Sequence, residues 1–97
     1  MKILEKKYIG NNLYLKIKKD NDIAASICGF FSLLEIGDAV LEFDREYEDV
    51  IDETIIYSDK NYSISVIGTK DSIHMIINYE ESLRKKLDAA LHKCVKL

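Results

Sequence analysis

Four side chains in this sequence are of the types that act as nucleophiles, bases or soft metal ligands: Cys28, His74, His92 and Cys94. They are scattered, and the two closest, His92 and Cys94, stand at a spacing that puts them on different faces of a helix. A cysteine nucleophile needs a base beside it, and nothing in the sequence places one next to either thiol. We therefore expect no catalytic residue and no metal site, and we do not expect an enzyme.

Motifs that hold cofactors are also missing from the sequence. It contains no G-x-G-x-x-G segment, no P-loop, no H-E-x-x-H and no G-x-S-x-G. These motifs supply the close backbone approaches and ligand pairs that nucleotides, metals and acyl groups require. We therefore expect no cofactor.

Carboxylates are the abundant reactive groups, and they gather between Asp38 and Glu53 in the segment DAVLEFDREYEDVIDE. Asp44, Glu46 and Glu48 have the alternate spacing of a calcium loop, but the glycine and the late glutamate of that loop are absent. Acid–base catalysis needs a cleft that separates the pKa values of two carboxyl groups, and a crowded exposed face gives no sign of one. This segment therefore offers negative charge for binding.

Helical spacing places the apolar residues of this acidic segment on one narrow arc: Val40, Phe43, Tyr47, Val50 and Ile51. Asp38 follows Gly37 and is the expected N-cap. Like charges then stand four residues apart, as in Glu42 with Glu46, and each such pair costs a helix about 0.2–0.5 kcal/mol. This cost favours a functional reason for the charge. The alternatives are a solvated face that keeps the protein soluble and a helix that ends early, leaving Glu48–Glu53 as a loop.

Charge is distributed unevenly along the 97 residues, although the net charge is only −3. Residues 1–34 carry six bases and three acids, residues 35–59 carry one base and ten acids, and residues 60–97 carry seven bases and four acids. An acidic pole of this strength repels phosphates, so we expect no direct nucleic-acid binding.

The start of the chain and its longest apolar run bear on localisation. Lys2 and Glu5 interrupt any signal-peptide core, and the longest uncharged run, Ile23–Leu34, is shorter than the ~20 residues that span a bilayer. Cys28 and Cys94 do not make a disulfide framework, and we expect both to be reduced, buried thiols. These features predict a cytoplasmic protein with no membrane partner.

The first part of the chain has the pattern of a β-hairpin. Residues Ile3–Ile9 and Leu13–Lys18 are the expected strands, joined by a glycine and two asparagines at positions 10–12 that tolerate a positive φ. The next run, Ile23–Ile36, keeps helical spacing after Asp22, although a buried strand remains an alternative for so short a run. If part of it is exposed, Phe30 and Phe31 would form a self-association patch.

The second half has the pattern of a three-stranded meander and a final helix. β-Branched runs bounded by turn residues predict strands at Thr54–Tyr57, Tyr62–Ile67 and Ile73–Tyr79. The helix is expected over residues 80–96, with Asn78 and Glu81 as its capping box. Its apolar stripe is Leu83, Leu87, Ala90, Leu91, Cys94 and Val95.

These elements predict a single compact α+β domain over residues 1–97. We expect a mostly antiparallel sheet with helices packed on one face, in the approximate order ββααβββα. The order of the strands within the sheet does not follow from the sequence.

The acidic segment predicts a small protein-binding module. The leading hypothesis is an inhibitor or immunity-type protein that occupies the basic site of a nucleic-acid-handling partner, such as a nuclease, in place of phosphates. The expected partner-binding residues are seven acids and one aromatic anchor: Glu42, Asp44, Glu46, Tyr47, Glu48, Asp49, Asp52 and Glu53.

Two alternatives compete with this hypothesis. The first is a small homo-oligomeric assembly or regulatory subunit, for example a homodimer, in which the meander edge or Phe30 and Phe31 meet a second copy and the acids serve solubility. The second is a ligand-binding module or enzyme with a pocket between sheet and helices, which needs convergent polar groups that the sequence does not reveal.

Overall fold

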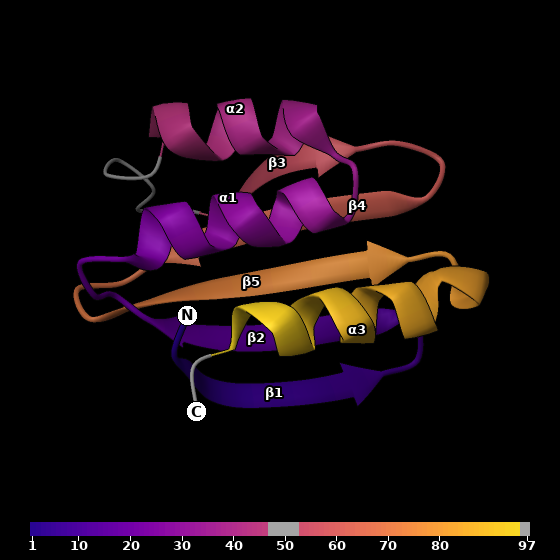
Figure 1. Ribbon diagram of the computed structural model, residues 1–97, viewed down its shortest axis with the longest axis horizontal. Coiled ribbons are helices and arrows are strands. Elements are labelled where there is room, and N and C mark those ends of the chain that lie inside the picture. The colour runs from indigo at the N-terminus through magenta and orange to yellow at the C-terminus, as the bar shows by residue number, and fades with distance from the viewer. Residues whose placement is uncertain (47–52, 96–97) are drawn as a thin grey trace.

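The chain folds as one five-stranded antiparallel sheet with its helices on one face (Figure 1). The computed structural model describes residues 1–46 and 53–95. The strands are β1 (Ile3–Ile9), β2 (Asn12–Lys18), β3 (Thr54–Ser58), β4 (Tyr62–Gly68) and β5 (Ser72–Tyr79). The helices are α1 (Ile23–Leu33), α2 (Gly37–Glu46), the short 3-10 turn η1 (Glu81–Leu83) and α3 (Arg84–Cys94). The predicted fold class and the element order ββααβββα are confirmed.

The strand order β1-β2-β5-β4-β3 places the last strand in the middle of the sheet. β5 pairs with β2 through Leu15 and Met75, and with β4 through Val66 and Met75. The hairpin β1–β2 therefore forms one side of the sheet, and the hairpin β3–β4 forms the other. Because β1 and β3 each have a neighbour on one side only, these two strands are the edges of the sheet within the part that the structure describes.

The first hairpin closes through a tight turn. Ile9 and Asn12 are paired across it, so only Gly10 and Asn11 lie between the strands. Gly10 has a φ of 57°, a conformation that glycine adopts without steric cost and that two-residue hairpin turns demand. The predicted turn at positions 10–12 is therefore confirmed, with Asn12 as the first residue of β2.

The predicted helix at Ile23–Ile36 is confirmed as α1, which ends at Leu33. Its end differs from the expectation that Gly37 would stop it. The left-handed residue is Glu35, with a φ of 61°, and its N–H donates to the carbonyl of Ser32 while that of Ile36 donates to Phe31. This pair of bonds is a Schellman motif. A motif that glycine usually closes is closed here by glutamate.

Helix α2 follows this turn directly and begins at Gly37. The expectation that Asp38 would be its N-cap is wrong, because Asp38 already lies in the first helical turn. The N–H of Ala39 donates to the carbonyl of Ile36, so the helical path starts before Asp38. Its carboxylate still suits the positive end of the helix dipole.

The meander is confirmed at β3, β4 and β5, and the final helix is confirmed as η1 and α3. The capping box of Asn78 with Glu81 is wrong. Asn78 belongs to β5, where its side-chain amide donates to Asn12 across the sheet. The chain leaves the strand at Glu80, which precedes η1 without a side-chain cap. Because β5 is paired on both sides, Asn78 takes part in sheet pairing and does not cap the helix.

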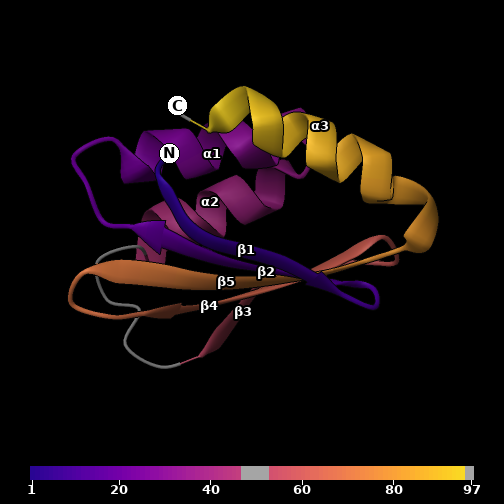
Figure 2. The same cartoon turned by 90° about the horizontal axis from the view of Figure 1, so that it is seen from below.

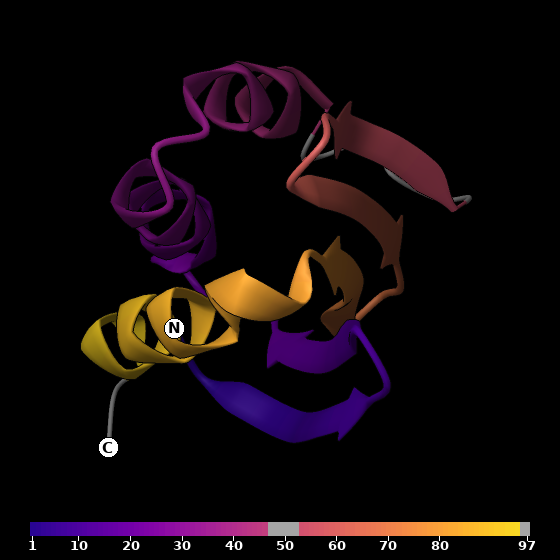
Figure 3. The ribbon, with the colours of Figure 1, turned by 90° about the vertical axis from the view of Figure 1, so that its right-hand side faces the viewer.

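The core lies between the sheet and the helical layer (Figure 2). Figure 3 shows the sheet curving around the helices, with α2 on the side of β3 and α3 on the side of β1. Phe30 and Phe31 are both fully buried at 0% exposure, so the exposed Phe30/Phe31 patch considered from the sequence is wrong. Full burial of such a side chain contributes about 1.5–3 kcal/mol. These rings hold α1 at the centre of the fold.

Candidate functional site

An element of the acidic stretch and an element rich in lysine form the two opposite edges of the sheet. Helix α2 packs against the edge strand β3, and both belong to the stretch 35–59 with its ten acids and one base. The opposite edge, β1, carries Lys6 and Lys7, and α3 above it begins with an arginine and two lysines (Figure 1). The side formed by α2 and β3 is called the acidic side for the stretch that supplies it, and its exposed, described carboxylates are Asp38, Glu53 and Asp59. The side formed by β1 and α3 is called the basic side.

Some of the predicted partner-binding residues share this acidic side in the structure. Glu42, Asp44 and Glu46 belong to α2. Glu53 directly precedes β3 and is exposed, and Ser65 Oγ donates to its Oε1 at 3.4 Å. Four of the predicted residues lie outside the described part of the chain: Tyr47, Glu48, Asp49 and Asp52. The described site is therefore the α2 helix together with the start of β3.

Of the predicted apolar stripe, the structure describes Phe43, which is 1% exposed, and Val40, which is partly buried against the core. The Phe43 ring meets Phe31 edge to face at a centroid distance of 6.1 Å, and Ala39, which the predicted stripe did not include, is also buried. Leu41, in contrast, is 70% exposed, and Ile55 on β3 is 69% exposed. The sequence analysis missed both as contact residues. Leu41 stands off the predicted stripe beside Val40, and that mismatch with the helical period was a usable signal.

One carboxylate of the acidic stretch has a structural task. Asp59 Oδ1 accepts hydrogen bonds from the N–H groups of Asn61 and Tyr62, both at 2.7 Å, and Oδ2 accepts one from the Tyr57 hydroxyl. The bond from Tyr57 is the main reason that the pKa of Asp59 lies below its usual range. The same bond is the main reason that the pKa of Tyr57 rises to about 12. Asp59 therefore builds the β3–β4 turn and is a poor choice for testing charge alone.

A second cluster joins β1 to α3 on the basic side. Lys6 Nζ and the Tyr8 hydroxyl both donate to Oδ1 of Asp88 at 2.9 Å, and the Arg84 guanidinium carbon lies 4.3 Å from the Tyr8 ring centroid. Hydrogen bonds from Lys6 and Tyr8 lower the pKa of Asp88, while burial and the bond to Asp88 raise the pKa of Tyr8. A groove of about 460 Å³ runs beside these groups. Because Asp88 Oδ1 accepts hydrogen bonds from two residues of β1, the cluster links α3 to that strand.

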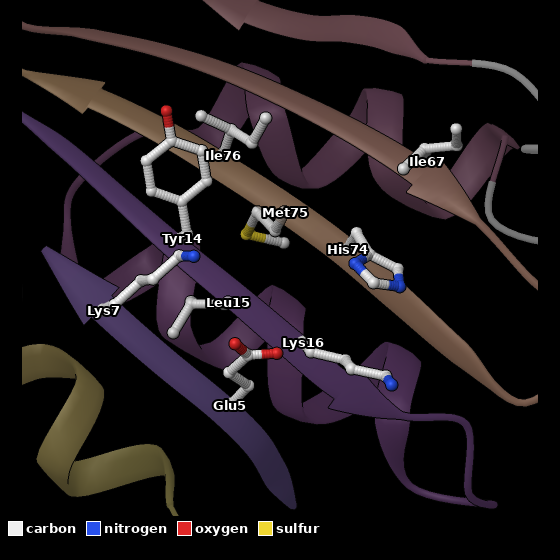
Figure 4. Close-up of a pocket in the computed structure, with 9 residues that line it drawn as sticks. All are labelled: Glu5, Lys7, Tyr14, Leu15, Lys16, Ile67, His74, Met75 and Ile76. Carbon is white, nitrogen blue, oxygen red and sulfur yellow. The ribbon is translucent and has the colours of Figure 1, made fainter. Parts of the chain in front are cut away.

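The open face of the sheet, opposite the helices, carries a hollow. Its volume is about 280 Å³. Tyr14 and Ile76 stand on one side of it, and Lys16 and His74 on the other (Figure 4). The two pairs are successive cross-strand pairs of β2 and β5. Leu15 and Met75 lie between them with their side chains buried at 3% and 0% exposure, so the hollow lies over their backbone.

The thiols and imidazoles do not assemble into a reactive centre. Cys28 and Cys94, expected to be buried, are only partly buried, and neither is in a disulfide. Burial raises the pKa of the Cys94 thiol, the opposite of what activates a nucleophile. His74 lies on the open sheet face and His92 on α3. In the described residues, no three of the histidine, cysteine, aspartate and glutamate side chains come together as metal ligands would.

Comparisons with known proteins do not identify a function for this site. No protein-family model, curated protein or solved structure matches this chain. Among the helices that the structure describes, none is long and apolar enough to cross a membrane.

Proposed function

We propose that this chain is a small protein-binding module that blocks a basic, nucleic-acid-handling partner, as an inhibitor or immunity protein does. The observation that supports the proposal is the separation of charge across the fold. The acidic stretch 35–59 supplies α2 and the edge strand β3, while lysines mark the opposite edge at β1. A surface with one sign of charge accelerates the encounter with a partner of the other sign.

Exposed aliphatic groups supply the second component that such an interface needs. Charged pairs at a rim contribute mainly to the association rate, whereas buried apolar anchors slow dissociation. Leu41 is 70% exposed and Ile55 is 69% exposed, and these residues belong to the two elements of the acidic side. Their burial by a partner would exclude water from that part of the interface. One side of the molecule therefore offers both charge, which would speed association, and exposed apolar area, which would slow dissociation.

The proposal places the protein in the cytoplasm, where a nuclease or a similar basic partner would meet it. Reducing conditions there keep thiols from forming disulfides, and neither Cys28 nor Cys94 is in a disulfide. The carboxylates would stand in for the phosphates of the partner's nucleic acid, so the partner's substrate and this protein would exclude one another.

The test is a capture experiment from a lysate of the native source at low salt, followed by a salt gradient and mass spectrometry. Wild type runs beside the variant E42K/E46K/E53K and beside E5K/D71K/E81K, which changes the net charge equally at exposed acids elsewhere. We expect a basic protein that binds to wild type and to the control E5K/D71K/E81K and is eluted by the salt gradient. The same protein should not bind to E42K/E46K/E53K. If the captured protein binds equally to all three proteins at physiological salt, the proposal is wrong.

A second candidate function, self-association through β3, has its own supporting observation. β3 is an edge strand of five uncharged residues, whereas the other edge carries Glu5, Lys6 and Lys7, the charges that usually prevent edge pairing. Sedimentation equilibrium of wild type and Ile55→Lys tests it. A mass that rises with concentration in wild type alone supports self-association, and a strict monomer at high concentration removes it.

A further inference from the structure

We infer that the hollow on the open sheet face is a binding site for a small planar aromatic anion. The inference goes beyond the proposed function, because the site lies over β2 and β5 on the face opposite the helices, apart from α2 (Figures 2 and 4). It rests on the shape of the hollow, the apolar and aromatic groups beside it, and the sign of the charge at its rim.

The shape follows from the register of the sheet. Tyr14 pairs with Ile76, and Lys16 pairs with His74, on the same face and two residues along each strand. Figure 4 shows the first pair standing apart from the second, with Leu15 and Met75 turned away between them. The space of about 280 Å³ equals the liquid volume of about nine water molecules. That volume suits a ligand of one or two rings and is too small for a helix.

The walls offer apolar and aromatic contact on more than one side. Ile76 and Tyr14 are partly exposed there, and Ile67, which pairs with His74, is 37% exposed. A flat ring placed between Tyr14 and His74 would have π systems on both sides and an isoleucine beside it. Aromatic side chains prefer such stacked or edge-on neighbours, and apolar walls with few polar groups are typical of small-molecule sites.

The rim carries two lysines, Lys7 and Lys16, and one glutamate, Glu5, which stands opposite Lys16 across β1 and β2. Lys7 on β1 pairs with Tyr14, and its Nζ lies 5.8 Å from the Tyr14 ring centroid. Among the described residues, Lys6 and Lys86 form ion pairs. The two rim lysines, Lys7 and Lys16, take part in neither of these pairs. Glu5 is the single carboxylate that lines the hollow. Two lysines and one glutamate leave the rim with a net positive charge, which favours a ligand with one negative group directed at the lysines.

The same charges argue against a second copy as the occupant. Packing two open faces together would bring Lys7 and Lys16 of one copy against those of the other. Only one glutamate per copy would offset them, and like charges buried at an interface are strongly unfavourable. A small anion meets both lysines without that repulsion.

The experiment is a ¹⁵N–¹H NMR titration of the whole chain with 2-naphthoate and with 2-naphthamide, which has the same rings without the charge. Phenyl phosphate is a third probe that distinguishes a phosphate-bearing ligand from a carboxylate-bearing one. We expect saturable shifts at residues 14–16 and 74–76, with a dissociation constant of about 1 mM or lower for the preferred anion. The amide should bind at least tenfold more weakly.

Substitutions of the rim residues test whether the anion binds in the hollow. K7E/K16E should weaken the binding of the anion at least tenfold, whereas K60E/K70E, an equal change at two exposed turn lysines, should leave it within twofold. Tyr14→Thr keeps a strand-forming residue and should also weaken both ring probes. Shifts that do not saturate, equal affinity for anion and amide, or shifts that map elsewhere would each overturn the inference. Binding of a nine-residue oligothymidylate in the absence of binding by any small anion would overturn it in favour of a nucleic-acid surface.

Discussion

Tyr8 and Asp88 lie 80 positions apart in the sequence and are joined by a hydrogen bond of 2.9 Å from the Tyr8 hydroxyl to Asp88 Oδ1. Lys6 Nζ donates to the same oxygen. Because β1 is an edge strand, it has a sheet neighbour on one side only. The carboxylate of α3 therefore ties down a strand that the sheet holds from a single side. The two ends of the described chain are linked in this way on the basic side of the fold.

This link predicts a specific dependence of stability on pH. The pKa of Asp88 is lowered in the folded protein, first by its hydrogen bonds from Lys6 and Tyr8. A lowered carboxyl pKa contributes stability above its unfolded value of about 3.9, and that stability is lost as the pH falls through the folded value. Asp88→Asn should lose about 0.5–1 kcal/mol at pH 7, a small effect because the side chain is 39% exposed.

Urea denaturation at pH 7, 4 and 2.5 measures this effect, with Asp71→Asn as the exposed control. The difference between wild type and Asp88→Asn should be largest at pH 7 and shrink as the pH falls. A difference that stays constant over the three pH values would mean that Asp88 acts through packing and not through its charge.

Helix α2 offers a matched pair of substitutions that separates the core from the contact surface. Phe43 is 1% exposed and Leu41 is 70% exposed, two residues apart on the same helix. Phe43→Ala should lower the free energy of unfolding by about 3–5 kcal/mol, because it removes the ring that meets Phe31. Leu41→Ala should change it by less than about 0.5 kcal/mol. Chemical denaturation measures both, and equal losses would show that Leu41 is not an exposed residue in solution.

Local patterns predicted most of the fold, and tertiary pairing decided the rest. Alternation in Leu13, Leu15 and Ile17 marks a half-buried strand, and all three are buried. The capping box failed at Asn78 because β5 is central and its last residues pair with β2 and β4. A sequence window around Asn78 contains no information about those two neighbours. The same holds for the strand order, which depends on contacts between residues more than 50 positions apart.

The candidate site was predicted only in part for a similar reason. The acidic stretch is a property of the sequence and needed no fold to find it. The hollow on the open face depends on Lys7, Tyr14 and His74 from three different strands, and only the register of the sheet brings them together. His74 is one of the four scattered reactive side chains of the sequence, and the structure places it on the uncovered face of the sheet.

Glu35 is the position where a single substitution should stabilise the fold. Its φ of 61° costs an L-residue roughly 1–2 kcal/mol, while glycine adopts it freely at the price of some unfolded-state entropy. Glu35→Gly should therefore raise the free energy of unfolding by about 0.5–1 kcal/mol. The ion pair that it removes, 3.6 Å to Lys86 Nζ with the Glu35 side chain 82% exposed, contributes little.

Glu35→Ala is the control for that substitution, since it removes the same ion pair but keeps a Cβ atom. Thermal or urea denaturation should rank the glycine variant above both wild type and the alanine variant. If glycine and alanine give equal stabilities, the left-handed conformation at position 35 is not strained in solution.

Tyr62 provides the reverse case, a polar atom whose removal should not harm the protein. The residue is 4% exposed, and in the described part of the chain its buried hydroxyl has no hydrogen-bond partner. Burial is also the main reason that its pKa is raised. A buried hydroxyl without a partner costs about 1–3 kcal/mol in lost hydration, so Tyr62→Phe should leave stability unchanged or raise it by up to about 1 kcal/mol.

Tyr8→Phe is the matched comparison, because its hydroxyl is bonded to Asp88 at 2.9 Å. Removing that hydroxyl should lower the free energy of unfolding by about 1 kcal/mol. Urea denaturation of the two variants at pH 7 therefore gives opposite or clearly unequal effects from the same chemical change. If Tyr62→Phe is as damaging as Tyr8→Phe, then the Tyr62 hydroxyl has a partner in solution, and a buried water between β4 and the helices becomes the first place to look for it.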